Sequence, residues 1–359
     1  MALLAVAIAP LPAAAQRDNQ RRIGISLPLS GDVERLGRQF LAGARLKLQE
    51  FNAEAGGTAD LAIVDDRCDE GVAALAADEL RQSGVSLVTG ILCNGVARVL
   101  ADALQPDGTA ILVAGARSER LTADRNRLRW KLWRLAPGDG EAARVAALAL
   151  SKRWNGKAYA IVDDGTVYGR GLADRFREAM EEAGLPPQFQ DNFRPTQSTQ
   201  ARLVRRLRRS GVTHAFVGAD AEDTAMIARN AREIGVPLTL AGGDVLSILP
   251  FSAADQQPPD GLLAVLSAYE TAATTDAAIA ERFLAAGVEP EPYALQGYRA
   301  LEVALAALGD TTAATADNLD RSRFDTLLGP VEFDGNGANM LPIHGLFEWR
   351  DGAFRRLDP

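Results

Sequence analysis

The chain of 359 residues is long enough for two domains, and its 47% hydrophobic content supports well-packed cores. The formal net charge of -8 at pH 7 argues against nucleic acid as a partner and gives no basic membrane-binding surface. The basic run RLVRRLRRSG (202–211) carries apolar residues at helical spacing, which indicates the solvated face of an amphipathic helix.

The first segment, MALLAVAIAPLPAAAQ, is uncharged and apolar, and small residues precede Gln16. This pattern is typical of a secretory signal, so residues 1–15 are expected to be a signal peptide that is removed. A disordered apolar tail is the alternative. The usual basic segment is missing, which leaves open a start further upstream. The apolar part is too short to span a bilayer, and no later segment approaches that length.

Strand-like and helix-like segments alternate through the first part of the chain. RIGISLP (22–28) places apolar residues on one face, and apolar residues then recur every four positions from Leu36 to Leu48. The first pattern predicts a strand and the second a helix. Further strands are predicted at 61–66, 85–90 and 110–115, with a helix between the first two of these.

The same pattern restarts in the second part of the chain. The predicted elements are a strand at 157–164, a helix at 168–183, a strand at 212–218, a helix at 223–234 and a strand at 238–243. Strand–helix–strand units with short connections predict parallel sheets with helices on both faces. The fold class is therefore α/β, with two doubly wound lobes. Two helices (276–286 and 293–308) and a β-like segment from Gly329 close the chain.

Cys68 and Cys93 are the two cysteines. An even count in an exported chain favours a disulfide, and two buried thiols are the alternative.

Polar residues follow the predicted strands, where open parallel sheets bind their ligands. They include Asn94, Arg117, Tyr168, Asp220 and Asp244. An arginine can form a forked pair of hydrogen bonds with a carboxylate, and Asp220 or Asp244 can take an ammonium group. The set therefore suits a zwitterion, whereas each charge alone is typical of a solvated loop.

Signatures of enzymes and cofactor sites are missing. The chain has no G-x-G-x-x-G after its first strand, no P-loop and no G-x-S-x-G, and its two histidines have no metal-site spacing. DGNGAN (334–339) lacks the sixth-position glycine and closing glutamate of a calcium loop, which favours a simple turn. The sequence predicts no catalysis, no cofactor and no metal.

Several stretches, in this order and spacing, resemble the leucine/isoleucine/valine-binding family of periplasmic substrate-binding proteins. They are IGISLPLSGDVERLGRQFLAGARLKLQEFNA, VDDRCDE with LVTGILCNG, LWRLAPGDGEAA, IVDDGTVYGRGLADRFREAMEEAG and GPVEFDGNG. The resemblance implies the type I fold, in which two Rossmann-like lobes joined by three crossovers close on a ligand. It assigns 16–137 plus 268–330 to the N-terminal lobe and 138–267 plus 331–359 to the C-terminal lobe.

The resemblance also implies roles for single residues. Asn94 and the backbone of Gly115 would bind the ligand carboxylate, Tyr168 is a tyrosine that the family keeps, and Asp244 would take the ammonium group. Cys68 and Cys93 fall where the family has a disulfide in its N-terminal lobe.

Two positions depart from the family pattern, and they change the charge of the predicted site. Arg117 stands where a hydroxyl residue is usual, and Asp220 stands where an aromatic residue is usual. These two residues would form a salt bridge across the cleft or contact a ligand with an extra charged group.

The function implied is that of a monomeric periplasmic binding protein. It would capture an amino acid or related small carboxylate and deliver it to the membrane permease of an ABC importer. A ligand-sensing or regulatory module of the same fold is the alternative.

Overall fold

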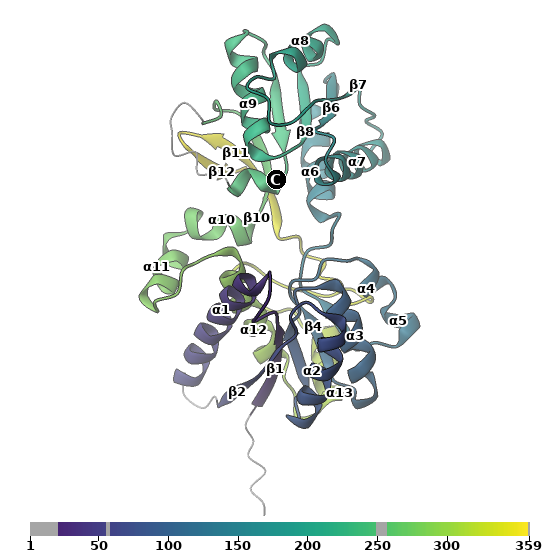
Figure 1. Ribbon diagram of the computed structural model, residues 1–359, viewed down its shortest axis with the longest axis vertical. Coiled ribbons are helices and arrows are strands. Elements are labelled where there is room, and N and C mark those ends of the chain that lie inside the picture. Colours follow the sequence, from purple (N-terminus) through teal and green to yellow (C-terminus); the bar gives the residue numbers. More distant parts are fainter. Residues whose placement is uncertain (1–20, 55–57, 249–256, 358–359) are drawn as a thin grey trace, which may run out of the picture.

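The computed structural model describes residues 21–54, 58–248 and 257–357. The expected signal peptide, residues 1–15, lies outside these residues. The chain folds into two α/β lobes stacked along the long axis of the molecule, and segments from three parts of the sequence pass between them (Figure 1). Among the described residues, every helix is too short or too polar to cross a lipid bilayer.

The first lobe is built on a five-stranded parallel sheet in the order β2-β1-β3-β4-β5. Alternate strand residues face opposite sides: Ile23 and Leu112 join one core cluster, and Val88 and Ile111 join the other. The strands are β1 (Arg21–Leu27), β2 (Ala59–Asp65), β3 (Leu87–Gly90), β4 (Ala110–Val113) and β5 (Leu132–Arg134).

Helices cover both faces of this sheet, as the doubly wound prediction requires. On one side α1 and α12 approach so closely that a Cβ at Gly43 would lie 1.8 Å from the Ala294 carbonyl oxygen. A Cβ at Gly297 would likewise meet the Phe40 carbonyl oxygen at 2.0 Å, so glycine is required at this crossing. The helices are α1 (Glu34–Ala53), α2 (Glu70–Gln82), α3 (Asn94–Leu104), η1 (Gln105–Asp107), α4 (Arg120–Ala123), α5 (Arg125–Leu128), α12 (Pro292–Ala307) and α13 (Thr312–Arg321).

The second lobe has a seven-stranded sheet in the order β12-β11-β10-β9-β8-β6-β7. Its strands are parallel except β11 and β12, which add to the edge as an antiparallel pair. The strands are β6 (Tyr159–Asp163), β7 (Phe189–Asn192), β8 (His214–Gly218), β9 (Thr239–Gly242), β10 (Leu263–Ser267), β11 (His344–Arg350) and β12 (Ala353–Arg356).

Two pairs of helices cover the faces of the second sheet. Helices α6 (Glu141–Trp154) and α7 (Val167–Glu182) pack on one side, and α8 (Ala201–Arg209) and α9 (Ala221–Glu233) pack on the other. Helix α8 buries Leu203, Val204 and Leu207, which confirms that the basic run is an amphipathic helix.

Three segments connect the lobes. The first runs from β5 to α6, and the second leads from β10 directly into α10 (Ala268–Thr275) and then α11 (Ala277–Ala285). Val331 and Phe333 pack in the core of the first lobe, and Ala338 bridges Arg134 of β5. We therefore infer that the third crossing follows Asn339 and enters β11.

Cys68 and Cys93 form a disulfide with a Cα–Cα distance of 5.5 Å, which confirms the predicted pairing. It joins the loop after β2 to the residue before α3. The Asp66 carboxylate supports this loop by accepting a hydrogen bond from the Cys68 N–H at 2.9 Å.

Candidate functional site

The candidate residues lie where strands of the two sheets end. In the first lobe, Asn94 begins α3 after β3, and Gly115 and Arg117 follow β4. In the second lobe, Tyr168 lies in the first turn of α7, Asp220 caps α9 and Asp244 begins the short helix η2 (Asp244–Ile248). Loops at the carboxyl ends of parallel strands can carry polar groups without disturbing the core, which explains their position.

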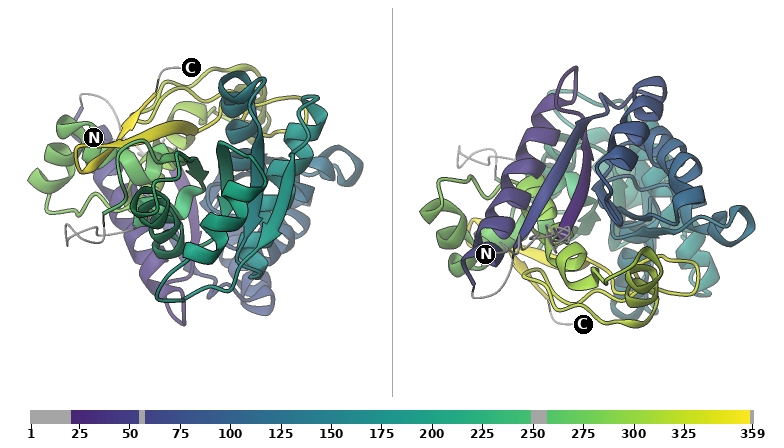
Figure 2. Two further views of the ribbon diagram at one scale, coloured as in Figure 1. Left: turned by 90° about the horizontal axis from the view of Figure 1, so that it is seen from above. Right: turned by 90° about the horizontal axis from the view of Figure 1, so that it is seen from below.

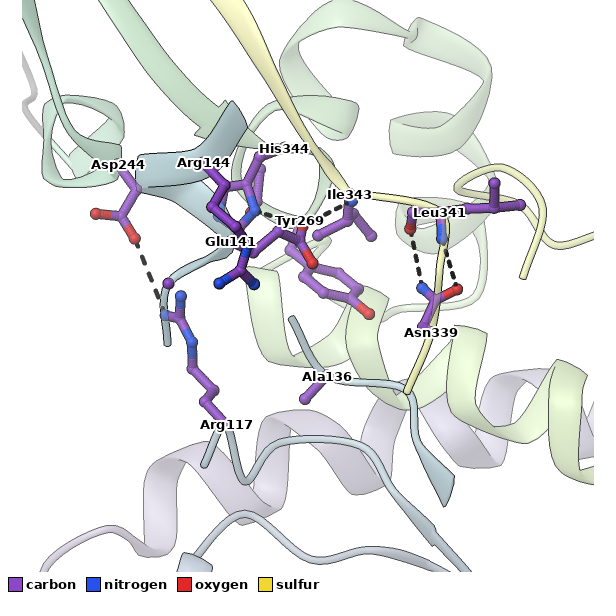
Figure 3. A network of polar contacts seen from close by, with 12 residues as sticks. Arg117, Ala136, Glu141, Arg144, Asp244, Tyr269, Asn339, Leu341, Ile343 and His344 are labelled. Carbon is purple, nitrogen blue, oxygen red and sulfur yellow. Dashed lines mark hydrogen bonds and ion pairs between the residues drawn. The ribbon is translucent and has the colours of Figure 1, made fainter. Parts of the chain in front are cut away.

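Arg117 and Asp244 face each other across the two lobes (Figure 3). The distance from Arg117 Nη1 to Asp244 Oδ2 is 4.0 Å, longer than a hydrogen bond. The two side chains are 39% and 21% exposed, and Arg117 Nε is buried without a hydrogen-bond partner. Opposite charges from the two lobes therefore lie close together, and Arg117 Nε is left without a hydrogen-bond acceptor.

Tyr168 extends the acidic side of this pair. Its hydroxyl donates a hydrogen bond to Asp244 Oδ1 at 2.9 Å. Tyr168 as a whole is 42% exposed, but desolvation of its hydroxyl, and then the negative charge of Asp244, raise its pKa well above the usual range, so the hydroxyl stays a donor. A Cβ at Gly243 would lie 3.0 Å from this hydroxyl oxygen, so glycine leaves the space in which Tyr168 reaches Asp244.

Asn94 and Gly115 hold the loop that carries Arg117. The Asn94 side-chain oxygen accepts a hydrogen bond from the Ser118 N–H at 3.0 Å. A Cβ at Gly115 would lie 2.4 Å from Leu92 Cδ2 and 3.0 Å from Leu92 Cα, so glycine is required for the two loops to pack together. Both residues thus lie beside Arg117, on the first-lobe side of the site.

Asp220 has a different setting. Its side chain is exposed and caps α9, because Oδ1 accepts the Asp223 N–H at 2.7 Å. Within the described residues, no hydrogen bond or ion pair joins Asp220 to Arg117, Tyr168 or Asp244. The structure therefore brings three of the predicted charged or hydroxyl groups together and leaves Asp220 outside their contacts.

A second ion pair between the lobes was not predicted. Glu119, in the loop after Arg117, contacts Arg144 of α6 with a distance of 2.8 Å from Oε1 to Nη2. The same oxygen accepts the Gly140 N–H at 3.4 Å. Burial works to raise the pKa of Glu119, but the hydrogen bond and charge of Arg144 outweigh it and lower the pKa overall.

Beside the site, Glu141, the first residue of α6, ties two of the three crossings together (Figure 3), and a backbone hydrogen bond joins the remaining one. Its Oε1 lies 2.7 Å from His344 Nδ1 and accepts the Ile343 N–H at 3.0 Å, which links the first crossing to the third. The Ala268 N–H donates to the Ile343 carbonyl at 3.0 Å, which links the second crossing to the third.

Glu270 and Tyr293 add polar groups near the charged pair that sequence reasoning missed. Glu270 accepts the Ser267 N–H at 2.9 Å at the start of α10. Burial, opposed by the Ser267 hydrogen bonds, raises its pKa, and the charge of Asp244 acts in the same direction as burial. Burial also raises the pKa of Tyr293, and the charge of Arg117 works against that shift. Within the described ranges, no three His, Cys, Asp or Glu side chains gather to form a metal site.

Two α/β lobes with opposed charges at their facing strand ends have the architecture of a two-lobed binding protein. Residues 20–352 match the periplasmic binding protein family, and the chain belongs to this family. This confirms both the predicted resemblance and the predicted fold class.

Named relatives span nearly the whole chain. The Leu/Ile/Val-binding protein homolog 3 of Brucella melitensis is 28% identical, covering 94% of this chain and 93% of its own. The Leu/Ile/Val-binding protein BraC3 of Rhizobium johnstonii is 26% identical, with 92% of each chain covered. A crystal structure of an ABC transporter substrate-binding protein from Desulfitobacterium hafniense in complex with Leu has a TM-score of 0.67 at 22% identity, covering 94% of this chain and 100% of that one.

Proposed function

We propose that this protein is the periplasmic substrate-binding component of an ABC importer and that it captures an amino acid or a related small carboxylate between its lobes. The family it belongs to supports binding rather than catalysis, and the names of its relatives support an aliphatic amino acid as the ligand class. We propose that it acts as a monomer and delivers its ligand to a membrane permease.

The observation that carries this proposal is the opposition of Arg117 and Asp244 across the two lobes. A zwitterion placed between them would satisfy both: its carboxylate would take the forked guanidinium, and its ammonium would take the aspartate. Because the two side chains are 4.0 Å apart, a ligand does not have to break a hydrogen bond between them.

Three of the other candidate residues fit this arrangement in supporting positions, whereas Asp220 caps α9 outside it. Asn94 and Gly115 hold the Arg117 loop, and the Tyr168 hydroxyl holds one oxygen of Asp244, which leaves the second oxygen for the ligand. A ligand that contacts both lobes would bind more tightly when the lobes are close together than when they are apart. This difference in affinity would be the driving force for closure.

Binding should be tested by isothermal titration calorimetry with leucine, isoleucine, valine and benzoate. We expect at least one amino acid to bind more tightly than millimolar. Arg117→Ala should weaken that affinity by a charged hydrogen bond, about 1.5–3 kcal/mol, or roughly 10–150-fold.

The matched control is Arg120→Ala, an exposed arginine three residues along the same segment, which should leave the affinity unchanged. Equal affinities of the Arg117→Ala and wild-type proteins would contradict the proposed site. Loss of leucine uptake in cells lacking the gene would favour the transport role over the sensing alternative.

A further inference from the structure

A pocket with a volume of about 350 Å³ lies between α10, α11, the 327–329 loop and the edge strands β11 and β12. We call it the hinge pocket. Small-molecule sites in proteins typically have volumes of about 300–1,000 Å³, so the hinge pocket is large enough for a small ligand. The interlobe candidates Arg117, Tyr168 and Asp244 are not among its lining residues.

The walls of the hinge pocket belong to different lobes. Ala272 of α10 and Ile279 of α11 pack in a cluster with residues of α1 and α12, so this wall belongs to the first lobe. Strands β11 and β12 form the other wall and belong to the second sheet. Figure 2 shows these yellow strands beside the light-green helices. Ala268 and Ile343, from the second and third crossings, also line the pocket.

The interior suits an aliphatic chain. Ala272, Ile279, Ile343 and Phe347 line the pocket, and each is less than a tenth exposed. An alkyl group entering between them would leave water for an apolar surface, which is favourable by roughly 25 cal/mol per Å² buried.

Arg356 gives the pocket a positive charge without a counter-ion. It lies opposite Phe347 in the β11–β12 ladder, and its guanidinium lies over Gly345, where a Cβ would be 3.2 Å from Arg356 Nε. Arg356 is exposed at the mouth of the pocket, and among residues 21–54, 58–248 and 257–357 it makes no hydrogen bond or ion pair. This guanidinium is therefore available to a carboxylate.

The other charged lining residue, Asp276, already has its partner. It caps α11, where Oδ1 accepts the Ala278 N–H at 3.0 Å, so the helix terminus stabilises its negative charge. Arg356 is thus the one cation among the described lining residues, and unlike Asp276 it has no hydrogen-bond partner.

We propose that the hinge pocket is a second binding site, which takes a small aliphatic monocarboxylate with its carboxylate on Arg356 and its alkyl chain between Ile279 and Phe347. This site is spatially separate from the proposed amino-acid site, with which it shares none of the residues Arg117, Tyr168 and Asp244. Because its occupant contacts both lobes, occupancy changes the balance between lobe arrangements. By thermodynamic linkage, each ligand then changes the affinity of the other by the same factor.

Hexanoate is a suitable probe, and its binding to the full chain can be followed by calorimetry or ligand-observed NMR. Arg356→Gln should weaken binding about tenfold or more. The control Arg355→Gln changes the neighbouring residue of β12, whose side chain points to the opposite face of the strand, and should have no effect. Hexanol and hexylammonium, which lack the carboxylate, should bind more weakly than hexanoate.

A second pair of variants tests the location without disturbing the core. Thr275 is exposed and lines the pocket, so Thr275→Trp should block hexanoate. Thr274 is exposed and does not line it, so Thr274→Trp should not.

Three results would contradict the proposal that the hinge pocket binds a monocarboxylate. The first is no hexanoate binding up to about 10 mM. The second is equal or tighter binding of hexylammonium. The third is loss of hexanoate binding in Arg117→Ala but not in Arg356→Gln, which would place hexanoate at the interlobe site and leave the proposed function intact. Failure of every amino acid to bind would contradict the proposed function alone.

Discussion

Glu141→Gln isolates the contribution of one carboxylate to the junction of the three crossings. The side chains of Glu141 and His344 are 13% and 1% exposed, so their contact is largely shielded from water. Glutamine keeps an oxygen that can accept the Ile343 N–H, but it removes the negative charge opposite His344. The variant therefore changes charge while preserving shape.

The magnitude follows from this burial. A hydrogen bond to a charged group contributes about 1.5–3 kcal/mol, and we expect Glu141→Gln to lower the free energy of unfolding by that amount near pH 6. The matched control is Glu119→Gln, whose partner Arg144 is 59% exposed. Exposed ion pairs contribute about 0–1 kcal/mol, so the control should lose less.

The effect of Glu141→Gln depends on pH with a definite sign. Burial tends to raise the pKa of Glu141, but the hydrogen bond and charge of His344 outweigh it, so the folded-state pKa lies below the ordinary value of 4.5. The stabilisation is therefore present above pH 4.5 and disappears as the pH falls through the folded-state pKa. The wild-type and variant proteins should become equally stable in acid.

Urea unfolding followed by tryptophan fluorescence and circular dichroism would measure this difference. Two lobes can unfold separately, so the transitions seen by the two probes should be compared before free energies are assigned. Equal midpoints for Glu141→Gln and wild type near pH 6, or a deficit that persists unchanged in acid, would refute the reasoning.

Three further predictions concern the disulfide, the half-buried carboxyl group of Glu302 and the hydroxyl of Tyr168. Replacing Cys68 and Cys93, which are separated by 25 positions, should cost roughly 3.5 kcal/mol in the chain-entropy model, and a reductant should lower the urea midpoint of the wild type but not that of the double variant. Burial raises the pKa of Glu302 to about 7, so its ionisation disfavours folding as the pH rises from 4.5 through 7. The Glu302→Gln variant should therefore be more stable than wild type by about 1–3 kcal/mol at pH 8 and equally stable at pH 4. Equal stability at pH 8 would contradict this prediction. Tyr168→Phe removes the hydrogen bond to Asp244 and should weaken leucine binding about 2–12-fold by calorimetry, whereas an unchanged affinity would place the hydroxyl outside the site.

Much of the fold was predictable because its strands and helices have strong periodicity. The strands at Tyr159–Asp163 and His214–Gly218 lie within the predicted ranges, and their apolar residues are buried as expected. The prediction missed β5 and β7, and it assigned no strand to the buried apolar run of β10. Strand β5 has only three residues, and β7 (FQDN) lies at a sheet edge with alternate residues exposed, so neither has an apolar run.

The proximity of Arg117 and Asp244 was predictable from the strand-end rule, whereas their role in binding stays a prediction. Arg117 and Asp244 each follow a buried strand, and parallel sheets place such residues at one edge. The contact of Glu141 with His344 was not predictable, because the two residues are 203 positions apart and meet only when the third crossing returns to α6. Glu119 and Arg144 are only 25 positions apart, but they belong to different lobes and meet only where the first crossing places α6 beside the loop after β4.

The central claim is that a single ligand is held by Arg117 and Asp244 together. Leucine and 4-methylpentanoate differ only in the ammonium group, so their affinities for wild type and Asp244→Asn form a cycle that isolates the contact of this group with Asp244. We expect the preference for leucine to shrink in Asp244→Asn by about 1.5–3 kcal/mol. An undiminished preference in that variant would contradict the account.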